Sequence, residues 1–136
     1  MKKKISILGS TGSIGISTLK IIDKKKNKFK IILLSSNNNY SLICKQIKMY
    51  KPKYFLIYDL NTFEKVKKKF KKNRVILINS LDINLNKIKS DIFVSAISGI
   101  KGLDPTLKII QFTKKILIAN KESVICGWKL IKEKAK

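Results

Sequence analysis

Histidine is missing from this 136-residue chain, and cysteine occurs only twice, at Cys44 and Cys126. The two cysteines form no C-x-x-C pattern, so the sequence contains neither a zinc motif nor the Ser/His or Cys/His pair of a nucleophilic enzyme. Both cysteines have apolar residues nearby in the sequence, and we expect them to be core residues in a reducing compartment. These absences exclude several common kinds of active site within these residues.

Acidic residues and arginine are also scarce. The chain has 31 Lys and Arg against 8 Asp and Glu, a formal net charge of +23, and Arg74 is its single arginine. Specific binding to nucleic acid favours arginine, because its planar guanidinium matches phosphates and base edges. The lysines are scattered or form short runs, which we interpret as solvated helix faces. We therefore expect no specific nucleic-acid partner.

No apolar run reaches the length of a membrane span. The run Ile5–Leu8 follows three lysines, but it is too short for the core of a signal peptide and leads directly into a glycine-rich turn. The length, with a hydrophobic content of 44%, fits one globular domain. We expect a cytoplasmic protein with no membrane partner.

Short apolar runs alternate with helix-length segments along the chain. The predicted strands are Ile5–Leu8, Lys30–Leu34, Tyr54–Tyr58, Val75–Ile78, Ile92–Ala96 and Ile116–Ala119. The predicted helices are Ser13–Lys25, Tyr40–Tyr50, Thr62–Lys72, about Pro105–Lys114 with Asp104 as its cap, and Ser123–Lys136, with a short helical turn in Asp82–Lys89. Continuous Ile, Leu and Val runs are typical of parallel strands buried on both faces. The pattern predicts an α/β fold, a Rossmann-like, doubly wound, mostly parallel sheet with helices on both faces.

Three glycines follow the first predicted strand at a spacing of three residues. Gly9 allows a sharp turn, Gly12 lets the backbone approach a pyrophosphate, and Gly15 allows the next helix to pack closely on the strand. The hydroxyl groups of Thr11 and Ser13 and the helix N-terminus add donors for an anion. The pattern is G-x-x-G-x-x-G rather than G-x-G-x-x-G, and a plain strand-to-helix turn is the alternative. The strand before it and the helix after it favour a nucleotide site.

The loop after the second predicted strand bears on the choice of cofactor. NAD-binding domains place Asp or Glu there to bind the ribose hydroxyls, whereas this chain has Ser35–Asn39 with no acid. Serine and asparagine can donate to a 2′-phosphate, so the loop favours NADPH over NADH. The alternative is an ordinary polar loop with Asn39 as a helix cap.

Two further polar segments follow the fifth and sixth predicted strands. They are Ile97-Ser98-Gly99 and Asn120-Lys121-Glu122. The carboxyl ends of parallel strands form the edge at which open α/β sheets bind ligands. Lys121 suits an anionic substrate, and Asn120 and Glu122 suit ribose hydroxyls or an amide. A solvated loop that caps the last helix explains the second segment equally well.

These residues resemble one family, the 1-deoxy-D-xylulose 5-phosphate reductoisomerases, NADPH-dependent enzymes of the non-mevalonate route to isoprenoids. The similarity is carried by Gly9–Gly15 with Ser17-Thr18-Leu19, by Gly99, Gly102-Leu103 and Pro105-Thr106, and by Ala119–Ser123. The resemblance covers essentially all 136 residues. It implies that residues 1–136 are the amino-terminal NADPH-binding domain of an enzyme that converts 1-deoxy-D-xylulose 5-phosphate to 2-C-methyl-D-erythritol 4-phosphate.

The resemblance also implies roles for individual residues. Contacts to the cofactor are implied for Thr11, Gly12, Ser13 and Ile14 at the pyrophosphate, for Asn37, Asn38 and Asn39 at the adenosine phosphate end, and for Asn120 and Glu122. Lys121 would contact the sugar phosphate substrate. At Asn37–Asn39 the family often has Gly-Lys-Asn, so this chain lacks one cation there.

The family continues with an Asp-Ser-Glu motif that binds Mg or Mn, then a lid loop and a helical carboxyl-terminal domain, none of which these residues contain. We therefore expect a truncated or split product, inactive alone, with no catalytic or metal-binding residue of its own. A separate carboxyl-terminal chain is a candidate partner, and the family is typically homodimeric.

Two rival interpretations stay open. A semialdehyde dehydrogenase-type NADP-binding domain uses a similar glycine cradle, but neither Cys44 nor Cys126 lies in the Asn-Cys-Thr-like setting of its nucleophile. A vestigial basic protein with incidental nucleic-acid binding could retain the same motifs without function.

Overall fold

A computed structural model describes residues 2–98, 100–119 and 121–135, with the backbone only for residue 100 and residues 121–126. The six strands that it contains are β1 (Lys3–Leu8), β2 (Phe29–Ser36), β3 (Tyr54–Ile57), β4 (Ile76–Ile78), β5 (Ser90–Ser95) and β6 (Thr113–Ile118). The helices are α1 (Ser13–Lys24), α2 (Tyr40–Tyr50), α3 (Leu60–Lys69), α4 (Leu103–Ile109) and α5 (Lys121–Ala135), with 3₁₀ turns at Leu85–Ile88, Ile100–Gly102 and Ile110–Phe112.

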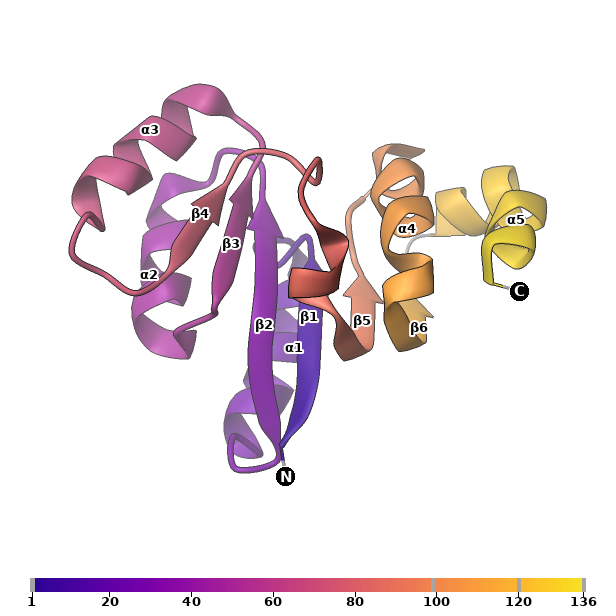
Figure 1. Ribbon diagram of the computed structural model, residues 1–136, viewed down its shortest axis with the longest axis horizontal. Coiled ribbons are helices and arrows are strands. Elements are labelled where there is room, and N and C mark those ends of the chain that lie inside the picture. The colour runs from indigo at the N-terminus through magenta and orange to yellow at the C-terminus, as the bar shows by residue number, and fades with distance from the viewer. Residues whose placement is uncertain (1, 99, 120, 136) are drawn as a thin grey trace.

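The strands form one sheet in the order β4-β3-β2-β1-β5-β6, and every described pair is parallel. Strands β2, β3 and β4 extend the sheet in one direction from β1, and β5 and β6 extend it in the other (Figure 1). The predicted Rossmann-like, doubly wound architecture is therefore confirmed. The strand order reverses at β1, which is where such sheets bind ligands.

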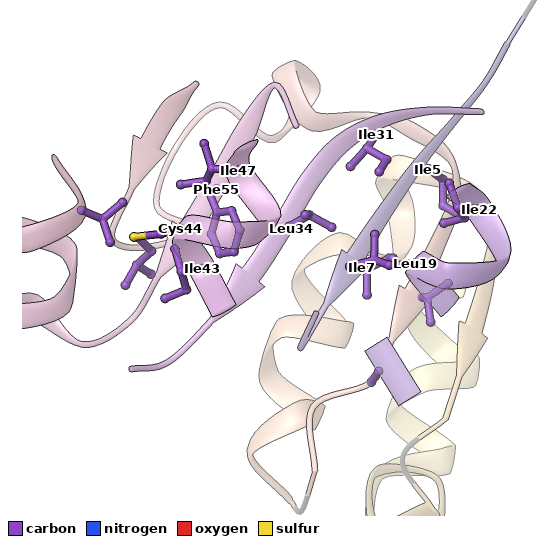
Figure 2. Close-up of a cluster of buried hydrophobic side chains, with 14 of the residues drawn as sticks. Ile5, Ile7, Leu19, Ile22, Ile31, Leu34, Ile43, Cys44, Ile47 and Phe55 are labelled. Atoms are coloured by element: carbon purple, nitrogen blue, oxygen red, sulfur yellow. The ribbon is translucent and has the colours of Figure 1, made fainter. Parts of the chain in front are cut away.

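Hydrophobic clusters cover both faces of the sheet. On one face, Ile5 and Ile7 of β1 pack with residues of α1, α2 and α3, and Figure 2 shows Leu19 and Ile43 pointing into this cluster from their helices. On the other face, Leu8 packs with Phe93, with the 3₁₀ turn before β5 and with α4. Successive β1 side chains thus alternate between two buried layers, as expected for a strand covered on both sides.

Some predicted boundaries were wrong. Helix α3 begins at Leu60 and ends at Lys69 rather than spanning Thr62–Lys72, because the side chain of Asp59 caps it. Helix α4 ends at Ile109, where a helix was predicted as far as Lys114. Asp104 lies in its first turn, and Gly102 occupies the N-cap position assigned to Asp104.

Candidate functional site

A groove of about 150 Å³ lies at the carboxyl edge of the sheet, where the strand order reverses. The loop after β1 lines it together with the last residues of β2 and the residues that follow β3 and β5. Four segments that are distant in sequence therefore meet at the place expected for a nucleotide. The lining residues are Gly9, Thr11, Gly12, Ser35, Ser36, Asn37, Tyr58, Ala96, Ile97 and Ser98.

Two of the three loop glycines are required by the fold itself. Gly9 has a φ of +82°, and a Cβ on it would lie 2.8 Å from the carbonyl carbon of Ala96. A Cβ on Gly15 would collide with the carbonyl oxygen of Gly9 and lie 2.6 Å from the Cα of Ser10. The sharp turn after β1 is therefore present, and α1 packs closely on that turn at Gly15.

Gly12 differs, because no contact among the described residues demands a glycine there. Its backbone is extended, with a φ of −80° and a ψ of 171°, and a Cβ would meet only Gly9 O at 3.7 Å and Ala96 O at 4.0 Å. Gly12 lines the groove and is the N-cap of α1 without a side-chain cap hydrogen bond. The first-turn N–H groups of α1 therefore have no side-chain acceptor from their cap, which suits an incoming anion.

The loop is held by a buried polar contact with α2. The Ser10 hydroxyl donates to Oε1 of Gln46 at 2.7 Å, and Nε2 of Gln46 donates back to the Ser10 carbonyl at 2.9 Å. Both side chains are buried. The backbone N–H of Ser10 also donates to the carbonyl of Ser35 at 2.8 Å. The sequence patterns did not identify this contact, although a glutamine between Ile43 and Ile47 on a buried helix face was a signal for it.

The end of β2 supplies hydroxyl groups beside the loop. The Ser35 hydroxyl accepts from the backbone N–H of Gly9 at 2.8 Å. The hydroxyls of Ser36 and Thr11 lie 2.7 Å apart. These contacts hold the end of β2 against the loop, and the groove has hydroxyl groups on both segments.

Carboxylates do not line the groove among the residues that the structure describes. Asp59, just beyond it, accepts hydrogen bonds from the hydroxyl of Thr62 at 2.7 Å and from its backbone N–H at 3.0 Å. These bonds lower the pKa of Asp59, and through them its carboxylate caps the N-terminus of α3. The groove is therefore compatible with a cofactor that carries an extra phosphate.

Tyr58 follows β3 and is the aromatic residue that lines the groove. Burial, together with the negative charge of Asp104, raises the pKa of Tyr58 to about 12. Its hydroxyl is therefore protonated at neutral pH. The sequence patterns indicated only that Tyr58 is the last residue of a strand and assigned it no role.

The predicted site residues fall into three groups. Thr11, Gly12 and Asn37 line the groove, whereas Ser13 and Ile14 are exposed in the first turn of α1. Asn38 is exposed, and the Oδ1 of Asn39 accepts from the backbone N–H of Leu42 at 3.2 Å, which makes Asn39 the cap of α2. Asn120 lies outside the described residues, as do the side chains of Lys121 and Glu122.

The described part of the chain contains neither a cluster of possible metal ligands nor a helix that could span a membrane. No group of three or more His, Cys, Asp or Glu that could hold a metal ion occurs among the described residues. Within those residues, no helix combines the length and the apolar character that crossing a membrane requires. Cys44 is buried, as predicted, and the side chain of Cys126 is not among those described.

Comparison with known proteins identifies the family. A model of the 1-deoxy-D-xylulose 5-phosphate reductoisomerase family matches residues 5–127. The reductoisomerase of Pelagibacter ubique (strain HTCC1062) is 51% identical over 139 residues, which cover 98% of this chain and 36% of that protein. The chain thus spans about a third of the length of the curated relatives it matches.

Solved structures of the same family superpose on the fold. The reductoisomerase of Zymomonas mobilis in complex with NADPH aligns with a TM-score of 0.88 and 28% identity, covering 98% of this chain and 36% of that one. A reductoisomerase in complex with NADPH, fosmidomycin and magnesium aligns with a TM-score of 0.86 and 30% identity, covering 98% and 34%. The similarity therefore extends over nearly the whole of this chain.

Proposed function

Because this chain belongs to the 1-deoxy-D-xylulose 5-phosphate reductoisomerase family, we propose that its residues bind NADPH in the groove at the strand reversal. The observation that carries the proposal is Gly12, where packing against the described residues does not require a glycine and the missing side chain leaves room for a phosphate. A groove with hydroxyl groups on two segments and no described carboxylate fits the phosphorylated cofactor. The similar reductoisomerase of Zymomonas mobilis was solved in complex with this cofactor.

Individual roles follow from the positions of the residues. Thr11, Gly12, Ser13 and Ile14 are proposed to bind the pyrophosphate, since all four lie in the loop or in the first turn of α1. Asn37, Asn38 and Asn39 are proposed to bind the adenosine phosphate end beyond β2. For Asn39 only the side-chain nitrogen is then available, because its Oδ1 caps α2. Asn120 and Glu122 remain proposed contacts to the cofactor and Lys121 to the sugar phosphate.

The proposed whole activity is that of the family, the NADPH-dependent conversion of 1-deoxy-D-xylulose 5-phosphate to 2-C-methyl-D-erythritol 4-phosphate. Bound NADPH supplies the hydride, and the loop residues hold its pyrophosphate and fix its position. The described residues contain no cluster of side chains that fits a divalent ion, so no role in holding a metal is assigned to them. We propose that metal ligands and catalytic residues belong to the remaining two-thirds of the family's length, in this polypeptide or a separate one, and that a homodimer in the cytoplasm is the working form.

Calorimetric titration of the 136-residue chain tests the cofactor proposal. We expect NADPH to bind more tightly than NADH, because a carboxylate that would repel the 2′-phosphate is missing from Ser35–Asn39. Equal affinities, or tighter binding of NADH, would show that the loop does not select the extra phosphate. No heat of binding from either cofactor would remove the proposed function altogether.

A further inference from the structure

Tyr58 occupies a position in the groove that packing does not explain. Its backbone is fixed, because its N–H donates to the carbonyl of Ser36 at 3.1 Å and its own carbonyl accepts from Nδ2 of Asn79 at 3.2 Å. Its side chain is 39% exposed and belongs to neither hydrophobic cluster of the sheet. A large aromatic ring is thus held at the rim of the groove without filling a core.

Tyr58 shares the groove with residues from the other half of the sheet. Tyr58 follows β3, whereas Ile97 follows β5, and β2 and β1 lie between these two strands. Tyr58 and Ile97 nevertheless line the same groove. Burial is the larger cause of the raised pKa of Tyr58, and the negative charge of Asp104, in the first turn of α4, adds to it. The groove that Tyr58 borders therefore reaches from the end of β3 to the residues that follow β5.

The order of the groups along the groove indicates what the ring meets. Gly12 and the start of α1 suit the pyrophosphate, and Ser36 and Asn37, one strand further, suit the ribose and its phosphate. The next strand is β3, so the base of a dinucleotide laid in this direction reaches Tyr58. A nucleobase can stack on the flat face of an aromatic ring, and such a contact adds to the affinity whichever base is bound.

We propose that the ring of Tyr58 stacks on the adenine of NADPH at the β3 end of the groove. This inference rests on the proposed function and assigns one of its contacts to a residue that the sequence did not single out. Stacking uses the face of the ring, and the hydroxyl is not needed for it. Phenylalanine at this position should therefore be an adequate substitute, and alanine should not.

The test compares Tyr58→Ala and Tyr58→Phe with the unaltered 136-residue chain. Three probes are titrated: NADPH, 2′,5′-ADP, which carries adenine, and inorganic pyrophosphate, which has no base. We expect Tyr58→Ala to bind NADPH and 2′,5′-ADP about ten-fold more weakly and pyrophosphate equally well. Tyr58→Phe should stay within about two-fold of the unaltered chain for all three. Leu60→Ala is the matched control, because Leu60, two residues further at the start of α3, is 60% exposed and does not line the groove.

Each other outcome overturns the proposal in a recognisable way. Unchanged NADPH affinity in Tyr58→Ala, while Gly12→Val loses binding, would reject the stacking contact and leave the proposed function standing. Equal weakening of pyrophosphate in Tyr58→Ala would reveal a general disturbance of the groove, and weak binding by Tyr58→Phe would assign the contact to the hydroxyl. If the unaltered chain binds no NADPH, the proposed function fails and the stacking contact fails with it.

Discussion

Replacing Gly12 by valine tests whether this glycine is required for cofactor binding or for folding. The new Cβ would lie 3.7 Å from Gly9 O and 4.0 Å from Ala96 O, which are ordinary van der Waals distances, and the extended backbone accepts any residue. Valine is a poorer N-cap than glycine, at a cost of about 1 kcal/mol. That is a small part of the 5–15 kcal/mol, roughly, that stabilises a domain. We therefore expect the variant to fold.

Binding should suffer far more than folding. The valine methyl groups would occupy the space that a pyrophosphate needs to reach the N–H groups at the start of α1. Loss of two charge-assisted hydrogen bonds at about 1.5 kcal/mol each amounts to about 3 kcal/mol. This corresponds to an affinity for NADPH roughly 100-fold lower. Calorimetry gives the affinity, and thermal unfolding followed by circular dichroism gives the stability.

Gly15→Ala is the control with the opposite pattern. Its Cβ would collide with the carbonyl oxygen of Gly9, so this variant should lose several kcal/mol of stability, on the order of 3 or more. NADPH bound by Gly12→Val with unaltered affinity would refute the reasoning, since the loop would then be a turn without a ligand. Unfolding of Gly12→Val with Gly15→Ala unaffected would refute the assignment of the two glycines.

Two further predictions concern activity and pH. The 136-residue chain, supplied with NADPH, magnesium and 1-deoxy-D-xylulose 5-phosphate, should show no oxidation of NADPH at 340 nm above the substrate-free rate, because no described cluster holds a hard divalent ion; substrate-dependent turnover would contradict this. Hydrogen bonds from the side chain and backbone of Thr62 lower the pKa of Asp59 from 3.8. Their contribution to stability is therefore complete above the pKa of Asp59 in the unfolded chain, and it is lost as the pH falls through the pKa in the folded chain. The melting temperature should fall below about pH 3.8, and less steeply in Asp59→Asn; parallel curves for the two proteins would rule out this contribution.

Local patterns predicted the first half of the chain well. Helix α2 spans Tyr40–Tyr50 as predicted, because Asn39 provides the cap and the apolar residues recur on one face. Strand β1 was recognisable because Ile5–Leu8 is buried on both sides, which leaves a short apolar run that only Ser6 interrupts. In both cases the same residues that form the element also make it recognisable in the sequence.

The failures lie where tertiary contacts override the local pattern. Strand β6 begins at Thr113, but Lys114 and Lys115 are exposed at the edge of the described sheet, so its first half carries no apolar run. Asp104 has the chemistry of a cap, yet the helix starts one residue before it. The place of Tyr58 beside the groove was not predictable either, because the groove is assembled from residues up to 49 positions away in sequence, such as Gly9.

The loop between β1 and α1 is fastened to α2 before any ligand arrives, because Ser10 and Gln46 satisfy each other's buried polar groups. A loop that already has its binding shape loses little conformational entropy on association, so more of the contact energy is retained as affinity. Affinity then depends on a helix that does not line the groove. A substitution at Gln46 would allow the loop to adopt several conformations. The affinity for every anion that binds there would then fall by the same factor. The second helix thus makes the phosphate loop a preorganised receptor.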